Sequence, residues 1–196
     1  MKTFPTGLPR TLEMIEQGIA AGWHIGAQVY VSLYDTSGEI PQPYPPPLFD
    51  TQEAYTRCNP GERARGPIRE LAYLYEMLLA HGERNGKRFL LPQTVEALTT
   101  CQRVNMRDET FGAVVNWGLG VAVNTASLSR RETFRYFDEH CSPRTFGHGG
   151  YHSSLGFADP EYGLVVTVLL NGTRPSSRFE AITASIYEEL GLISRE

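Results

Sequence analysis

The segment SSLGFADPEYGLVVTVLLN, residues 153–171, restricts the fold more than any other part of the sequence. Two strand-like runs flank the turn-forming residues DPEYG, and this arrangement predicts an antiparallel hairpin. The second run is apolar on both of its faces, which is typical of a central strand that is covered on both sides. The chain is therefore expected to build a sheet with helices packed against it.

Apolar periodicity predicts the other elements. A helix over residues 11–21 has Leu12, Ile15 and Ile19 on its apolar face and ends at Gly22. The remaining expected elements are a strand over 27–34, helices over 67–82 and 92–100, a strand over 117–123, and a helix from Phe179 through Leu190 to Gly191. This order predicts an α+β domain in which N- and C-terminal helices flank a mostly antiparallel sheet.

Residues 35–66 interrupt this pattern. They contain six of the thirteen prolines and show no sustained apolar period. So long a stretch without an element is unusual inside a compact domain. We therefore expect three parts: a first helix and strand in residues 1–34, an irregular proline-rich segment in 35–66, and the rest of the same domain in 67–196.

Composition excludes several classes of function. The net charge is −4 and basic residues are scattered, so nucleic-acid binding is not expected. No apolar run approaches the length of a membrane span, and the first residues lack the apolar core of a signal peptide, so a cytoplasmic location is expected. An odd number of cysteines (Cys58, Cys101 and Cys141) favours reduced thiols over a disulfide framework.

The region around residue 148 holds the candidate chemistry. His140, Cys141, His148 and His152 lie close in sequence, but Gly149 and Gly150 disfavour a helix that would align two of the imidazoles. We expect no metal and no other cofactor. Ordinary structural roles are expected for other residues: Trp117 as a core or rim aromatic, Tyr75 as the more buried of two helix tyrosines, and Asp108, Glu109, Asp159 and Glu161 as solvated turn carboxylates.

The segment FGHGGYHSSLGFADPEYGLVVTVLLNG resembles the third motif of the serine β-lactamase and penicillin-binding-protein superfamily. It is most similar to the class C β-lactamase and related esterase branch, in which His-x-Gly can replace Lys-Thr-Gly. The resemblance extends to GWHIGAQVYVS, residues 65–100 and WGLGVAV, which are similar to the family's first strand, its later helices and the strand that follows. The series covers about four-fifths of the chain in the family's order.

The resemblance implies roles for five residues. His148 would contact a substrate carboxylate or support proton transfer, and the backbone N–H of Tyr151 would contribute to an oxyanion hole. Gly149 and Gly150 would leave room for a ligand along the strand, and Ser153 would line the site. The implied partner is a small ester, amide or β-lactam.

The family's nucleophile is absent from the sequence. No serine has a lysine three residues later, and no tyrosine or serine has an asparagine two residues later. Ser153 and Ser154 begin a strand, so at most one of them can face the site. The resemblance therefore implies a serine hydrolase by ancestry that has lost its helical domain and its activity. The alternative is a non-enzymatic binding or oligomerisation module, such as a homodimer formed through a bare sheet face.

Overall fold

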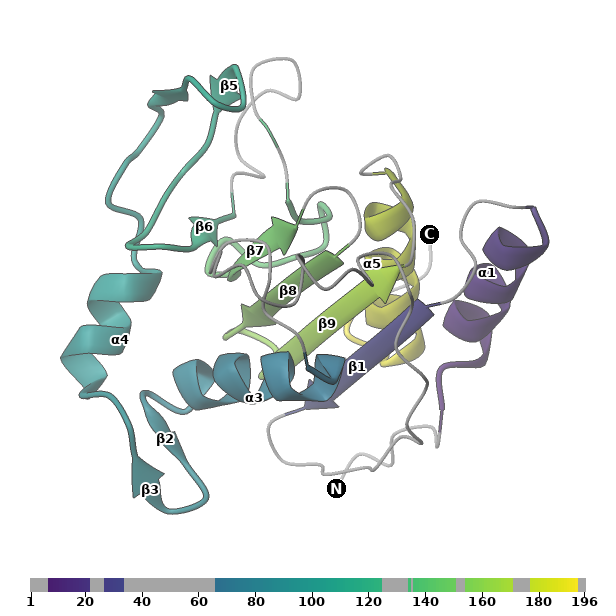
Figure 1. The fold of residues 1–196 in the computed structure, drawn as a ribbon, viewed down its shortest axis with the longest axis horizontal. Helices are drawn as coiled ribbons and strands as arrows, with labels where there is room; N and C mark the ends of the chain where they lie inside the picture. The colour runs from purple at the N-terminus through teal and green to yellow at the C-terminus, as the bar shows by residue number, and fades with distance from the viewer. Residues whose placement is uncertain are drawn as a thin grey trace, which may run out of the picture.

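The computed structural model describes residues 7–21, 27–33, 66–124, 134, 136–150, 154–170 and 177–193. They form an α+β domain built on a five-stranded antiparallel sheet, as predicted (Figure 1). Across the sheet the strands are β1 (Ala27–Leu33), β9 (Leu164–Leu170), β8 (Ser154–Asp159), β7 (Phe146–Gly150) and β6 (Ala122–Val123). Within the described residues no helix is both long and apolar enough to cross a membrane. Of the predicted irregular segment 35–66, only Gly66 lies inside the described residues.

The predicted hairpin is confirmed. Strands β8 and β9 pair from Ser154 opposite Leu169 to Asp159 opposite Leu164, and Gly163 adopts a positive φ of 62° in the turn between them. Strand β9 also pairs with β1 on its other side. Val165 and Val166, which point to opposite faces, are 1% and 0% exposed. The doubly apolar pattern therefore marks a strand that is covered on both faces.

Helices cover both faces of this sheet (Figure 1). On one face, α1 (Pro9–Ala20) and α5 (Ser177–Glu189) contribute to a core that includes Val166 and Val168. On the other face, α3 (Ile68–Leu79) packs Ala72, Tyr75 and Leu78 against β7, β8 and β9. The expectation of a bare apolar sheet face is therefore wrong for the described strands. Helices α1 and α5 cover one face of the sheet, and α3 covers the other.

Short elements connect α3 to the far edge of the sheet. They are β2 (Glu83–Arg84), β3 (Lys87–Arg88), α4 (Pro92–Thr99), β4 (Arg107–Asp108) and β5 (Ala113–Val114). β2 pairs with β3 and β4 pairs with β5, so each pair is a small antiparallel ribbon. Gly82, with a φ of 91°, follows the end of α3 and donates a hydrogen bond to the Met77 carbonyl, which explains why the helix stops there.

The predicted strand over residues 117–123 is wrong in its first part. Only Ala122 and Val123 form β6, and Trp117 makes isolated bridges to Arg103 and Ala122. Gly118 donates a hydrogen bond to the Val121 carbonyl, and Gly120 has a φ of 97°, so the chain turns between them. The alternating glycines that imitate a strand face are turn residues.

The first helix exists and Ile15 is buried as predicted, but the predicted apolar face is wrong for its other two residues. Leu12 and Ile19 are 56% and 41% exposed, while Thr11, Ile15 and Gly18 form the buried face. The reason lies in α5: the Thr11 hydroxyl is 2.9 Å from the Ser185 hydroxyl and donates a 2.6 Å hydrogen bond to Glu189. Polar contacts with α5 therefore determine which face of α1 is buried, and the apolar pattern of α1 alone does not predict this face.

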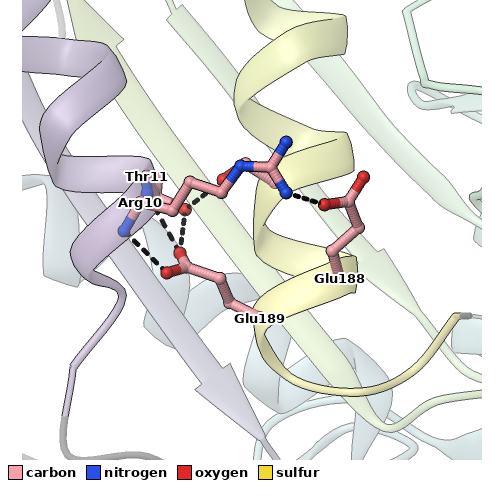
Figure 2. A network of polar contacts seen from close by, with 5 residues as sticks. Arg10, Thr11, Glu188 and Glu189 are labelled. Carbon is pink, nitrogen blue, oxygen red and sulfur yellow. Dashed lines mark hydrogen bonds and ion pairs between the residues drawn. The ribbon is translucent and has the colours of Figure 1, made fainter. Parts of the chain in front are cut away.

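Glu189 ties the start of α1 to the end of α5 (Figure 2). Its carboxylate accepts hydrogen bonds from the backbone N–H groups of Arg10 and Thr11, at 2.7 and 3.0 Å, besides the Thr11 hydroxyl. These N–H groups belong to the first turn of α1, which has no side-chain cap of its own. Burial opposes ionisation of Glu189, but these bonds and the Arg10 charge hold its pKa below the usual value.

Replacing Glu189 with glutamine is expected to lower the free energy of unfolding at neutral pH by about 1 kcal/mol, because charge-assisted capping bonds weaken. A folded pKa below the unfolded one contributes stability above the ordinary glutamate pKa and loses it as the pH falls. The difference between variant and wild type should therefore shrink in urea titrations toward about pH 3. Glu188→Gln is the matched control, since Glu188 pairs with the half-exposed Arg10 side chain. An equal loss in both variants would contradict the capping role.

Candidate functional site

His148 lies on the exposed edge of the sheet. Strand β7 pairs along its inner side with β8, but on its outer side β6 reaches only Phe146 and Gly147. The three residues His148, Gly149 and Gly150 therefore continue past the end of β6. The His148 side chain is exposed, Gly149 is partly buried and Gly150 is exposed.

The His148 imidazole has a defined hydrogen-bond direction. Its Nδ1 lies 2.6 Å from the carbonyl oxygen of Gly149. A carbonyl only accepts hydrogen bonds, so Nδ1 carries the hydrogen. In the neutral ring, Nε2 is then the acceptor nitrogen, and it can take a proton or a hydrogen bond from a ligand.

Aromatic rings surround this imidazole. The His148 ring centroid lies 5.5 Å from that of Trp117 and 5.2 Å from that of Tyr136. The ring centroids of Phe111 and Phe134 lie 5.9 and 4.9 Å from that of Tyr136, and 4.6 Å from each other. We call Phe111, Trp117, Phe134 and Tyr136 the aromatic wall. The prediction that Trp117 is a core or rim aromatic is confirmed, since it is partly buried at the margin of the main core.

Asp108 orients the Trp117 ring. Its carboxylate accepts a 3.0 Å hydrogen bond from Trp117 Nε1 and further bonds from the backbone N–H groups of Thr110 and Phe111. The Arg103 guanidinium lies 3.7 Å from the same carboxylate. Burial opposes ionisation, but these hydrogen bonds and the Arg103 charge hold the pKa of Asp108 below its usual range. The expected solvated carboxylate is therefore wrong at Asp108, whose side chain is only 14% exposed.

Tyr136 completes the wall in its neutral form. Burial, and then the nearby Asp108 charge, raises the pKa of Tyr136 to about 12. The phenol therefore keeps its proton at neutral pH. Sequence patterns gave no signal for Tyr136, because it follows no helical or strand period. Only the folded chain brings it beside His148.

The glycines of β7 make room for the protein's own side chains. A Cβ on Gly149 would lie 2.8 Å from the Tyr136 ring, and one on Gly150 would lie 2.3 Å from the Ser154 hydroxyl. The resemblance predicted that this room would serve a ligand lying along the strand. In the structure Tyr136 fills the space beside Gly149 and Ser154 fills the space beside Gly150, and these two glycines face opposite sides of β7.

Tyr75 supports His148 from α3. A Cβ on Gly156, the β8 residue opposite His148, would lie 2.6 Å from the Tyr75 ring, so the tyrosine fits closely against this glycine. Burial raises the pKa of Tyr75 to about 12, partly offset by a hydrogen bond from the His148 backbone. Tyr75 is 5% exposed, as predicted, and it fixes the backbone of the strand that carries the imidazole.

Ser154 is the described serine that shares a face with His148. It lies opposite Gly150 in the β7–β8 ladder, and Gly150 is two residues from His148 on the same strand. Tyr151 and Ser153, the other two predicted site residues, lie outside the described residues. The proposed oxyanion contribution of Tyr151 and the lining role of Ser153 therefore stay predictions.

A second polar cluster centres on Asp159, which contradicts the expectation of a solvated turn carboxylate. Asp159 is 0% exposed. It accepts hydrogen bonds from the Ser142 N–H and hydroxyl, the Glu161 N–H and the Tyr187 hydroxyl, at 2.8, 2.6, 3.1 and 2.6 Å. Burial raises the pKa of the adjacent Cys141 to about 12, so this free thiol stays protonated. The cluster joins β8, α5 and the segment before β7.

His140 belongs to this structural region and pairs with Asp138 through Nδ1. In the part of the chain that the structure describes, no three His, Cys, Asp or Glu side chains gather in an arrangement suited to a metal ion. His152, the fourth residue of the histidine-rich stretch, lies outside the described residues.

Comparisons with known proteins agree with the fold. A family model described as Beta-lactamase matches residues 20–189. A solved β-lactamase from Mycobacterium bovis is 24% identical with a TM-score of 0.51, over 64% of this chain and 44% of that one. No curated protein sequence matches the chain.

Two further solved structures are more distant. A penicillin-binding-protein homologue from Caulobacter crescentus is 24% identical, and a family VIII carboxylesterase is 22% identical. Each has a TM-score of 0.48 over 61% of this chain and 31% of the other. The chain thus spans less than half the length of these three proteins.

Proposed function

Because this chain belongs to the β-lactamase family, we propose that it binds a small ester, amide or β-lactam beside His148 without cleaving it. Its ancestry is that of a hydrolase. A hydrolase of this family needs a sheet edge that contacts the ligand and a serine that attacks it. His148 and its neighbours are candidates for the sheet edge, but no serine in the sequence has the lysine that would activate it.

The observation that carries the proposal is the distribution of lysine. The sequence contains lysine only at positions 2 and 87, and the residue three positions before Lys87 is Arg84. Ser-x-x-Lys therefore cannot occur. A serine hydroxyl is a weak nucleophile until an adjacent base takes its proton, and removing such a nucleophile costs on the order of 10⁶ in turnover.

A shortened interval supports the same proposal. The sequence has 32 residues between positions 35 and 66, which is far too few for a helical domain. The chain also spans only 44% of the Mycobacterium bovis β-lactamase. We propose that residues 35–66 stand where the family's helical domain is inserted, and that this domain carried the nucleophile.

Incubation with a fluorescent penicillin or a fluorophosphonate is expected to leave the protein unlabelled, because no serine in the sequence has the lysine three residues later that would activate it. Intact-mass spectrometry after one hour checks this, with an active class C β-lactamase as the positive control. Ser154 is the described serine on the His148 face, so Ser154→Ala is the matched variant. A covalent adduct that disappears in Ser154→Ala would show that Ser154 and His148 act as a substitute pair, and would overturn the proposal.

A non-enzymatic interaction module, such as a homodimer, is the second candidate function. Both faces of the described sheet are covered, so such a module would use another surface. Nine large apolar side chains among the described residues are exposed, and five of them lie between residues 89 and 119: Phe89, Leu91, Val104, Met106 and Leu119. This stretch is the surface that we would assign to a protein partner.

A further inference from the structure

We propose that Trp117, Tyr136 and His148 bind an aryl group that carries an O–H or N–H donor, such as a phenol or an anilide. This inference rests on the proposed ligand site at His148 and names the class of ligand that the site selects. Its basis is the arrangement of three rings at the exposed edge of β7 together with the hydrogen-bond direction of the imidazole.

The three rings contact one another pairwise, and His148 is exposed while Trp117 and Tyr136 are partly exposed; we call the exposed side of this ring cluster the corner. Trp117 and Tyr136 lie 6.1 Å apart with an interplanar angle of 63°, while His148 is inclined to them by 32° and 41°. Rings at such angles are not a parallel stack, so the cluster offers both ring faces and ring edges to a ligand. Aromatic groups prefer offset and edge-to-face contacts of this kind, which a flat aryl ligand can make with all three rings at once.

The corner is held in place before any ligand arrives. Phe111 contacts Trp117 at 6.1 Å and Tyr136 edge-on at 5.9 Å, and Phe134 contacts Tyr136 edge-on at 4.9 Å. Asp108 fixes the indole through its 3.0 Å hydrogen bond with Nε1. Rings that are already ordered lose little conformational entropy on binding, which favours affinity for a rigid ligand.

The charges around the corner disfavour a cationic ligand, although cations also bind aromatic rings. Asp108 is the carboxylate in contact with the wall, and its oxygens already accept bonds from Trp117, Thr110 and Phe111. Arg103 lies 3.7 Å from the same carboxylate and balances its charge. Among the described residues, a neutral aryl group therefore meets no unbalanced charge at this position.

His148 selects the polar part of the ligand. Because Nδ1 donates to the Gly149 carbonyl, Nε2 of the neutral ring accepts. A phenol O–H or an anilide N–H lies next to its aryl ring and can donate to Nε2 while the ring contacts Trp117 and Tyr136. An ether of the same shape cannot make this bond.

Titration with 2-naphthol, 2-methoxynaphthalene and decahydro-2-naphthol tests the proposal, with imidazole and backbone chemical shifts as the readout. We expect 2-naphthol to shift His148 and the residues of the wall, and the other two compounds to bind at least about tenfold more weakly. Each comparison removes one element, either the donor or the aromatic ring. Equal binding of all three compounds, or no binding of 2-naphthol, would overturn the proposal.

Variants locate the contact. Tyr136→Leu, which keeps bulk over Gly149, is expected to weaken 2-naphthol binding about tenfold, while Leu12→Ala removes an exposed apolar side chain outside the wall and should leave it unchanged. His148→Phe keeps a ring but loses the acceptor, so it should bind 2-naphthol and 2-methoxynaphthalene equally. Preference for 2-naphthol that survives His148→Phe would contradict the assignment. These results are independent of covalent labelling. A protein that is not labelled and does not bind 2-naphthol would therefore refute the aryl site but leave the proposed loss of the nucleophile intact.

Discussion

Replacing Asp159 with alanine is expected to lower the free energy of unfolding by about 3–5 kcal/mol, one of the largest losses that any single side chain of this protein can cause. The carboxylate is fully buried and accepts four hydrogen bonds. Alanine would leave the donors of Ser142 and Tyr187 without partners inside the core. Urea unfolding followed by circular dichroism measures the loss.

Tyr187→Phe is the graded control for this network. Burial, and then nearby negative charge, raises the pKa of Tyr187 above its ordinary value, so its hydroxyl remains a donor. Phenylalanine removes that one donor and keeps the ring, which packs edge-on against Tyr162 at 5.5 Å. We expect a loss of about 1–2 kcal/mol. A loss in Asp159→Ala no larger than that in Tyr187→Phe would contradict the role of Asp159 as the centre of the cluster.

The predictability of the fold depended on how strongly each element is patterned. Strand β9 was predictable because four of its buried residues are valine or threonine, and only a central strand tolerates apolar residues on both faces. The face of α1 was not predictable, because Thr11 is buried through hydrogen bonds to Ser185 and Glu189, more than 170 residues away in the sequence. Local periodicity contains no information about a partner so distant.

The candidate site was predictable to the same limited extent. The glycine pair and the hairpin that follows pointed to His148, and the structure places it at a sheet edge. Tyr136 was missed because it reaches its place beside Gly149 only in the folded chain, and Asp108 was misjudged as solvated because its role depends on one hydrogen bond to an indole. Asp159 was misjudged for a related reason: turn carboxylates are usually solvated, and only the tertiary donors around this one make burial possible.

Gly147→Ala is expected to destabilise the protein by about 3 kcal/mol or more, and to disrupt the strand that carries His148. A Cβ at this position would lie 2.2 Å from the Gly156 carbonyl oxygen and 2.6 Å from the Phe157 Cα. Both atoms belong to the backbone of β8, so neither can move without opening the β7–β8 ladder. The free energy of unfolding and the hydrogen-exchange protection of β7 amides should fall together.

Gly150→Ala is the matched control on the same strand. Its added Cβ would meet the Ser154 hydroxyl at 2.3 Å, but that hydroxyl is the end of a side chain that can rotate away. We expect a cost below about 1 kcal/mol, since a rotamer change suffices. The contrast separates a position of β7 that needs glycine from one that merely tolerates it. Equal losses at the two positions would show that the close approach of the β8 backbone does not dictate the glycine at 147.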